Sequence, residues 1–335
     1  MNITVLGSGG WGTALAMVLF ENGNAVTMWT HSAEECRRLR RERSNPKLLP
    51  GVTIPESIRI TDKLTDAADS EMVIMAVPSF AVYSTALKLA EVIKPGAIVV
   101  NVAKGLDRDN GYCRFSQSID KALGGKNPVV ALTGPTHAEE VARFIPTTIL
   151  AASKDQKAAE MVQDVFMSER FRVYVSGDII GAELGGAFKN IIALAVGVLD
   201  GMGYGDNTKA ALMTRGLTEI ARLGISLGAN SETFAGLSGV GDLIVTCTSM
   251  HSRNRRAGIL IGQGKDVPTA MREVGAVVEG YYATEAGYRL AQKTGVEMPI
   301  ITATYAVLYQ GADPTAAAKQ LMTRSKKHET EDVWL

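Results

Sequence analysis

The stretch NITVLGSGGWG, residues 2–12, begins as a short apolar run and ends in the glycine pattern G-x-G-x-x-G. An apolar segment to residue 20, a turn at residues 21–24 and a second apolar run at residues 25–29 follow. Strand, glycine turn, helix and strand within about 30 residues are typical of a dinucleotide-binding βαβ unit. There Gly7 would permit the tight turn, Gly9 would let the backbone approach a pyrophosphate, and Gly12 would let the helix pack closely on the strand.

The overall composition is that of an ordinary globular protein. Of 335 residues, 46% are hydrophobic and 21% charged, and the length favours about two domains of ~150 residues. Lys+Arg and Asp+Glu both number 35, so the net charge is zero. This balance argues against a nucleic-acid or membrane-surface partner. A small anionic substrate needs only a local cluster of positive groups and is compatible with it.

The cysteines and the terminal segments carry few signals. Cys36, Cys113 and Cys247 are odd in number and lack metal-ligand spacing, which predicts free thiols in a reducing compartment and no metal site. The first predicted strand begins at residue 2, leaving no room for a signal peptide. The apolar stretch at residues 179–199 contains Glu183 and Lys189, so we expect a buried helix rather than membrane insertion. We expect a cytoplasmic protein.

The two halves of the chain differ in pattern. Apolar runs suited to strands recur at residues 72–77, 97–102, 129–133, 147–152 and 171–175, with helical patterns at 81–93 and 157–166. Such unalternated runs indicate a parallel sheet covered on both faces. Helical periodicity then continues at residues 179–199, 208–227, 252–261, 267–273, 284–294 and 300–309. The sequence predicts an α/β fold: an N-terminal Rossmann-type doubly wound domain, residues 1–178, and a mostly helical C-terminal substrate and catalytic domain, residues 179–335.

Polar side chains follow several predicted strands, where ligands bind in a doubly wound sheet. Lys104 comes just after the run at residues 97–102. Thr136 follows the run at residues 129–133 and lies three residues before Glu139. That spacing is a capping box, so Thr136 either caps a helix or contacts a ligand, and the two roles are compatible.

Lys189 is the most suggestive single residue. It lies in a predicted helix among glycines and alanines, which would leave a hollow around its amine. Burial would lower the pKa of the ammonium group towards the range useful for proton transfer. The alternative is a lysine whose amine reaches water, and the pattern does not decide between them.

Two further segments contain candidate polar groups. Asp242 follows a glycine-rich turn and precedes an apolar run, so it is either a functional carboxylate or a helix N-cap. The segment SRNRR, residues 252–256, opens a predicted helix. A serine cap, the helix dipole and an adjacent guanidinium would together bind phosphate, and the alternative is a solvated basic turn.

Cofactor choice is made at the end of the second predicted strand. An NAD-selective site usually has Asp or Glu there. Here the strand ends in Thr30-His31-Ser32, with no acidic residue before Glu34. The basic run at residues 37–43 is typical of a solvated helix face but follows this strand. The pattern favours NADP, or a site that accepts both cofactors.

In this order the segments resemble the bacterial-type NAD(P)-dependent glycerol-3-phosphate dehydrogenases. The matching segments are GSGGWGTALA, NVAKGL, TGPTHAEEVA, GAFKNIIALAVGVLDG, GLSGVGDLIVTC, HSRNRR and VVEG, from residue 7 to residue 280. One departure is Gly10, where family members often carry serine. It removes one possible phosphate hydrogen bond and keeps the backbone donors.

The resemblance implies roles for individual residues. Lys189 would be the catalytic acid/base, aided by Lys104 and Asp242, with Thr246 one helical turn beyond Asp242 supporting it. The implied substrate-binding residues are Lys104, Gly134, Thr136, Lys189, Asp242, Ser252, Arg253 and Asn254. The implied cofactor-binding residues are Gly7, Gly9, Gly10, Trp11, Gly12, His31, Lys104, Ala138, Arg253, Val277 and Glu279.

The implied reaction is hydride transfer between NAD(P)H and dihydroxyacetone phosphate, giving sn-glycerol 3-phosphate for glycerophospholipid synthesis. A homodimer is expected from the resemblance. One alternative is a β-hydroxyacid dehydrogenase of the same two-domain plan, which typically has asparagine four residues after its helical lysine. Here position 193 is Ala and the asparagine is Asn190. The other alternative, a non-catalytic dinucleotide sensor, would not need Lys104, Lys189 and Asp242 together.

Overall fold

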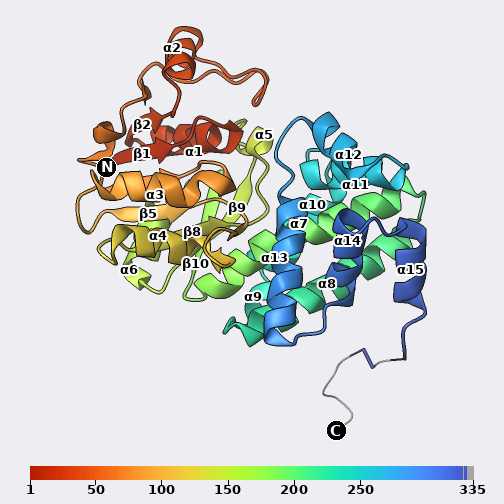
Figure 1. Ribbon diagram of the computed structural model, residues 1–335. Coiled ribbons are helices and arrows are strands. Elements are labelled where there is room, and N and C mark those ends of the chain that lie inside the picture. Colours follow the sequence, from red (N-terminus) through yellow and green to blue (C-terminus); the bar gives the residue numbers. More distant parts are fainter. Residues whose placement is uncertain (327, 330–335) are drawn as a thin grey trace.

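The computed structural model describes residues 1–326 and 328–329. Residue 327 and residues 330–335, at the end of the predicted second domain, lie outside the described residues. The protein has two lobes that lie side by side (Figure 1). The first lobe is an eight-stranded sheet with helices on both faces, and the second is built of helices.

The sheet contains every strand that the apolar runs predict. Its strands are β1 (Asn2–Leu6), β2 (Ala25–Trp29), β3 (Arg59–Thr61), β4 (Met72–Met75), β5 (Ile98–Asn101), β8 (Val129–Thr133), β9 (Thr147–Ala152) and β10 (Phe171–Ser176), in the order β10-β9-β8-β5-β4-β1-β2-β3. The strands β6 (Leu106–Asp107) and β7 (Cys113–Arg114) form a separate antiparallel pair. Sequence periodicity missed β3, β6 and β7 because two or three residues are too few to show a pattern.

The sheet is not wholly parallel, which corrects the prediction. Strand β9 pairs antiparallel with β8 and parallel with β10, so these two strands run against the others. The link from β8 to β9 contains only α5 (Ala138–Val141), a helix of four residues. Four helical residues span about 6 Å, which is too short to return the chain along the sheet for a parallel crossover.

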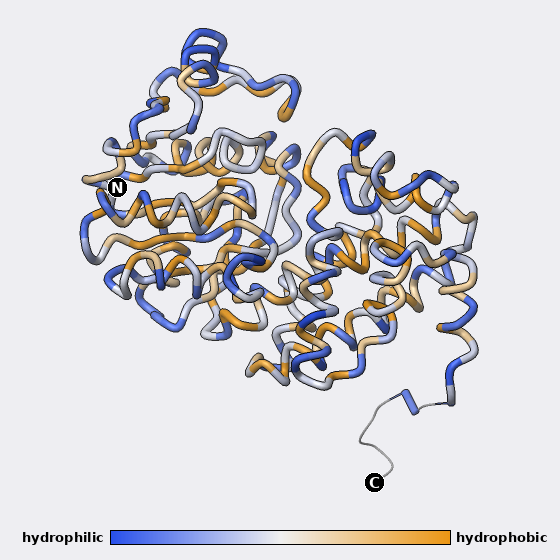
Figure 2. Tube along the Cα trace, viewed as in Figure 1, coloured by the Kyte–Doolittle hydropathy of each residue, from blue (hydrophilic) through white to orange (hydrophobic). Residues whose placement is uncertain are grey.

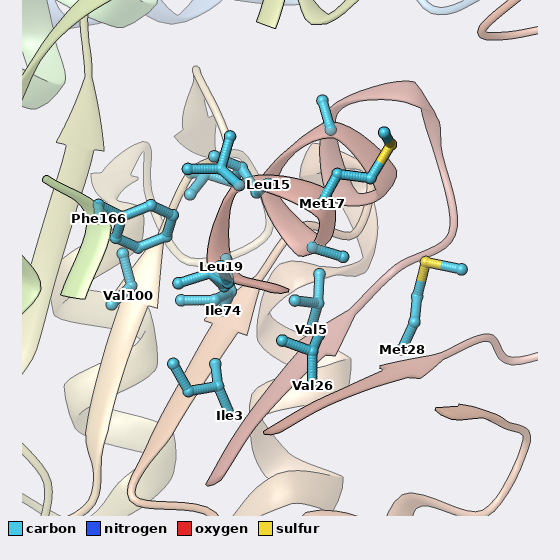
Figure 3. Close-up of a cluster of buried hydrophobic side chains, with 14 of the residues drawn as sticks. Ile3, Val5, Leu15, Met17, Leu19, Val26, Met28, Ile74, Val100 and Phe166 are labelled. Carbon is cyan, nitrogen blue, oxygen red and sulfur yellow. The ribbon is translucent and has the colours of Figure 1, made fainter. Parts of the chain in front are cut away.

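Helices cover both faces of the sheet. One face is packed by α1 (Gly10–Glu21) and α6 (Gln156–Phe166), and the other by α3 (Val82–Ala90) and α4 (Phe115–Leu123). Figure 3 shows Leu19 of α1 over the strand residue Ile74, and Phe166 of α6 next to Val100. Because both faces are buried, the strands read as continuous apolar runs rather than as alternating ones.

The second lobe is organised around α7 (Ile179–Gly201). Around it lie α8 (Asp206–Ser226), α9 (Ser231–Phe234), α10 (Asp242–Thr248), α11 (Arg253–Gly262), α12 (Val267–Val274), α13 (Glu279–Thr294), α14 (Pro299–Tyr309) and α15 (Pro314–Met322). By length and composition α7 could cross a membrane, but 89% of its apolar window is buried inside the protein. The prediction that this segment is a buried helix is confirmed.

Helices α7 and α11 cross almost backbone to backbone. A Cβ atom on Gly258 of α11 would lie 2.1 Å from the carbonyl oxygen of Leu194 on α7. The same close approach occurs at Gly197, Gly201 and Gly262. Real Cβ atoms do not approach backbone so closely, so only glycine permits this crossing. It fixes the start of α11 relative to the middle of α7, where Lys189 lies.

We expect Gly258→Ala to destabilise the protein by about 1–3 kcal/mol, because the added methyl group forces two backbones apart. Gly177→Ala is the matched control, since a Cβ there would meet nothing within 4 Å. Denaturant unfolding of both variants measures the difference. Equal midpoints for the two variants would show that the helices can separate at no cost.

Candidate active site

The glycine pattern forms an open cradle at the end of β1. Gly7 has a φ of 125°, and a Cβ there would lie 2.4 Å from the carbonyl oxygen of Ala76. A Cβ on Gly12 would lie 2.2 Å from the carbonyl oxygen of Gly7, so both glycines are required by packing. At Gly9, the N-cap of α1, a Cβ would meet nothing within 4 Å. The start of α1 is therefore open to a pyrophosphate, which its free N–H groups would bind.

The start of α5 adjoins this cradle. A Cβ on Gly10 would lie 3.7 Å from the Cβ of Ala138, and Trp11 and Ala138 both pack against the core of the sheet lobe. The structure thus brings together three residues expected at the cofactor. His31, at the end of β2, is exposed at the same end of the sheet.

Two lysines share one buried carboxylate where the lobes meet. Lys104 donates from Nζ to Oδ2 of Asp242 at 2.7 Å and to the carbonyl oxygen of Gly134 at 2.9 Å. Lys189 donates to Oδ1 of Asp242 and, at 2.6 Å, to Oγ1 of Thr246. The Asp242 side chain is only 1% exposed, whereas that of Lys104 is 19% exposed. The Lys189 side chain is 6% exposed, so Lys104 is the more accessible of the two lysines.

Burial controls the protonation of Lys189. Its side chain is 6% exposed, so its amine does not extend to water as the alternative required. Loss of solvation lowers the pKa of Lys189 to about 7, the Asp242 carboxylate opposes this fall, and the Lys104 charge adds to it. A pKa near 7 lets this amine both donate and accept a proton at neutral pH.

Two helix-capping interpretations are resolved by the structure. Asp242 is the first residue of α10 and its carboxylate bonds to the lysines, not to the helix start. Thr136 does not cap either: α5 begins at Ala138 with His137 as its N-cap residue, and Thr136 Oγ1 donates to the carbonyl oxygen of Gly134 at 3.2 Å. The capping-box spacing fails because the chain turns one residue later than the pattern implies.

The basic segment at residues 252–256 divides into two parts. Ser252 caps α11 by accepting from the backbone N–H of Arg255 at 3.2 Å. The Arg255 guanidinium donates to Asp200 at 2.8 Å and to the carbonyl oxygen of Thr248 at 2.6 Å, so it holds the loop in place. Arg253 is exposed at the first position of α11. Arg253 is thus left exposed at this helix start while Arg255 is engaged.

Asn254 is a junction between three helices. Its amide donates to Oδ1 of Asn190 on α7 at 2.9 Å and accepts from the backbone N–H of Gly280 on α13 at 2.8 Å. Glu279 precedes Gly280 and reaches the sheet lobe, where its Oε2 lies 3.5 Å from the position of a Cβ on Gly105. Burial raises the pKa of Glu279. Val277, two residues earlier, is half-buried.

Comparison with known proteins identifies the family. Residues 2–159 and 178–319 match the N-terminal and C-terminal models of NAD-dependent glycerol-3-phosphate dehydrogenase. The chain belongs to this family. It is 50% identical to glycerol-3-phosphate dehydrogenase [NAD(P)+] of Desulfitobacterium hafniense over 99% of this chain and 94% of that protein. Identity to the enzyme of that name from Thermoanaerobacter sp. is 52%, over 99% of this chain and 100% of that protein.

The fold agrees with this family. The crystal structure of glycerol-3-phosphate dehydrogenase from Coxiella burnetii superposes with a TM-score of 0.92 at 36% identity, covering 96% of this chain and 99% of that chain. The enzyme is therefore an NAD(P)-dependent glycerol-3-phosphate dehydrogenase with a Rossmann-type domain that binds NAD or NADP. These matches favour this function over a β-hydroxyacid dehydrogenase and over a dinucleotide sensor.

His137 is a polar group of the dehydrogenase site that the sequence pattern did not single out. His137 lies in the quoted segment TGPTHAEEVA, with its ring centroid 5.6 Å from that of His251. Burial and the nearby Lys189 charge lower the pKa of His137, and its buried Nε2 has no hydrogen-bond partner among the described residues. Its place in the motif beside Thr136 was the available signal.

The described residues contain no group of three or more His, Cys, Asp or Glu suited to a metal ion.

The cofactor-selecting edge of the dehydrogenase differs from its sequence pattern. Helix α2 (Ala33–Glu42) stands at the edge of the lobe and is largely hydrophilic (Figures 1 and 2). Oε2 of Glu35 accepts from Thr30 Oγ1 at 3.0 Å, so a carboxylate reaches the end of β2 from this helix. A hollow of about 430 Å³ beside it is lined by Ser32, Glu34, Glu35, Arg37, Arg38 and Arg41. The end of β2 therefore has both a carboxylate, which is typical of NAD sites, and guanidinium groups, which suit the 2′-phosphate of NADP.

Proposed function

We propose that this dehydrogenase interconverts dihydroxyacetone phosphate and sn-glycerol 3-phosphate with Lys189 as the acid/base. One observation supports this most strongly: two lysine amines bond to the buried Asp242 carboxylate, and Lys104 comes from the same end of the parallel strands as the open glycine cradle. A carbonyl placed near these amines would be at the carboxyl edge of the sheet, where ligands bind in this fold.

The residues divide the chemical work in this proposal. When bound, the nicotinamide supplies or accepts the hydride. Lys189 as ammonium holds the proton for the carbonyl oxygen and, when neutral, takes it back in the reverse reaction. Lys104, the more exposed of the two lysines, adds positive charge near the developing alkoxide. Asp242 holds both amines in place, and Thr246, one turn further along α10, accepts a second hydrogen bond from Lys189.

We assign the substrate phosphate to the start of α11. Arg253 supplies an exposed guanidinium there, and the first N–H groups of the helix add donors. Ser252 shapes this start as its cap. Since Asn254 is engaged by Asn190 and Gly280, it acts here mainly by holding the site together. Gly134 and Thr136 complete the substrate pocket opposite.

We assign the dinucleotide to residues 1–178 and the substrate and catalytic groups chiefly to residues 179–335. The proposed cofactor contacts are Gly7, Gly9, Gly10, Trp11, Gly12, His31, Lys104, Ala138, Arg253, Val277 and Glu279. We further propose a cytoplasmic homodimer that acts on a small phosphorylated substrate. The activity places the enzyme in lipid metabolism, where its product is the backbone of glycerophospholipids.

The acid/base role predicts both a mutant phenotype and a pH dependence. Lys189→Met should lower kcat by about 10²–10⁴-fold with cofactor binding almost unchanged. In the parent, kcat/KM for reduction should fall as pH rises through about 7, because the free enzyme loses the ammonium form; oxidation should show the opposite slope. Lys293→Met, on the exposed side of α13, is the control. Turnover of Lys189→Met within about tenfold of the control would remove Lys189 from this role.

The phosphate assignment predicts a selective loss of substrate binding. Arg253→Ala should raise KM for dihydroxyacetone phosphate by roughly 10- to 100-fold, since a charge-assisted contact contributes about 1.5–3 kcal/mol. Arg256→Ala, an equally basic and exposed neighbour, should change KM little. Unphosphorylated dihydroxyacetone should be a poor substrate for all three enzymes. An equal loss in both variants, or with both substrates, would show that Arg253 does not read the phosphate.

We expect NADPH to be used at least as well as NADH. Arg37 and Arg38 line the hollow beyond β2, so replacing both by Ala should raise KM for NADPH and leave KM for NADH unchanged. Because these side chains are near the surface, the effect should weaken with salt. Arg172→Ala, on an exposed position of β10, is the control. Steady-state kinetics that showed a strongly NADH-selective parent would contradict this expectation.

A further inference from the structure

Glu183 is a buried carboxylate that the reaction as described does not use. It lies on α7, six residues before Lys189, and its side chain is 4% exposed. Its oxygens accept from the Arg114 guanidinium at 2.7 Å and from the backbone N–H of Ser116 at 2.8 Å, and also from the Ser116 hydroxyl. These donors belong to the sheet lobe, so Glu183 bonds α7 to the other lobe.

A fourth donor connects Glu183 to the turn that carries Lys104. Asn101 ends β5, and its Nδ2 lies 3.5 Å from Oε1 of Glu183. The same Asn101 amide accepts from the backbone N–H of Ala103 at 3.2 Å and donates to the Ala103 carbonyl at 3.3 Å. Asn101 therefore holds the shape of the turn immediately before Lys104.

The packing of α7 reinforces this connection. A Cβ on Gly186, midway between Glu183 and Lys189, would lie 2.7 Å from Oγ1 of Thr133 and 3.9 Å from Cγ of Lys104. Helix α7 thus lies directly on the ends of β5 and β8. Because Lys104 and Lys189 come from different lobes, the separation of their amines depends on where α7 sits on these strand ends.

We propose that Glu183 is a positioning residue that, through Asn101, sets the separation of Lys104 and Lys189 on either side of Asp242. The inference rests on the proposed roles of these lysines. Another ion pair between the lobes, Arg108 with Glu285, has a half-exposed arginine and lies outside the lysine centre. The bonds of Glu183 to Ser116 and Asn101 are buried, and Asn101 connects Glu183 to the Lys104 turn.

A purely structural role makes a different prediction. Ser116 lies in the first turn of α4, so Glu183 could serve only to satisfy the start of that helix. Loss of Glu183 would then lower stability without changing the lysine pair. The pH profile of Glu183→Ala separates the two roles, because only the positioning role moves Lys104. Asn101→Ala is the companion variant: it removes the contact with Glu183 and the bonds to Ala103 and leaves the bonds at the start of α4 intact.

The pKa of Lys189 reports the position of Lys104. The groups that face Lys189 are Asp242, Thr246 and Cys247 on α10, Lys104 after β5, and His137 before α5. Among them Lys104 lowers the pKa of Lys189. If Lys104 moves away, the pKa of Lys189 rises, and the alkaline fall of kcat/KM for reduction moves to higher pH.

The experiment compares Glu183→Ala and Asn101→Ala with Lys104→Met and a control. Asp178→Ala is the control because Asp178 caps the same helix, accepting from Gly181 N at 2.9 Å, and its other bonds are to Asn230 and Thr233 rather than to the Lys104 turn. Both test variants should lose about tenfold or more in kcat, because small misplacements of reacting groups are costly. Both should move the alkaline limb to higher pH, as Lys104→Met does. Asp178→Ala should lower the unfolding midpoint and leave the alkaline fall of kcat/KM at the pH of the parent enzyme.

Four further outcomes decide the inference. The double variant Glu183→Ala/Asn101→Ala should shift the alkaline fall of kcat/KM no further than either single variant does. Glu183→Gln should have a higher kcat than Glu183→Ala. An unshifted limb in Asn101→Ala, with a shifted limb in Lys104→Met, overturns the positioning role even if Glu183→Ala fails to fold. An unshifted limb in Lys104→Met overturns the proposed lysine pair itself.

Discussion

The carboxylate of Asp242, buried between two lysine amines, is the interaction on which the site depends. A carboxylate with 1% of its side chain exposed is costly unless charged partners satisfy it, and two adjacent amines repel each other unless an anion lies between them. Asp242, Lys104 and Lys189 therefore stabilise one another only as a set. They come from α10, the turn after β5 and α7, so both lobes must be in place before the centre exists.

Helix α7 is the element that makes this arrangement possible. It carries Lys189, it lies on the ends of β5 and β8 through Gly186, and it crosses α11 through glycines that allow backbone contact. Each contact is close enough that a single methyl group would disturb it. Close packing of this kind holds catalytic groups at fixed distances, which is what proton transfer to a bound carbonyl requires.

Several residues have roles that their sequence neighbours did not indicate. Arg255 lies in the same basic segment as Arg253, yet it bonds to Asp200 and holds the loop while Arg253 remains exposed. Thr136 has the spacing of a helix cap and bonds to Gly134 instead. Glu35 reaches the end of β2 from the following helix, where the strand itself offers no acid. In each case a partner outside the local pattern decides the role.

The sequence alone determined the features that depend on local backbone and composition. Gly7 and Gly12 could be assigned because close approach and a positive φ exclude other residues, and buried strands and long helices have patterns of their own. Tertiary structure decided what depends on distant partners. Strand β9 runs antiparallel to β8 because α5 is too short for the crossover that a parallel pairing needs. The lowered pKa of Lys189 results from burial by the surrounding elements. The pairing of Lys104 with Asp242 joins residues 138 positions apart, and no local pattern reports it.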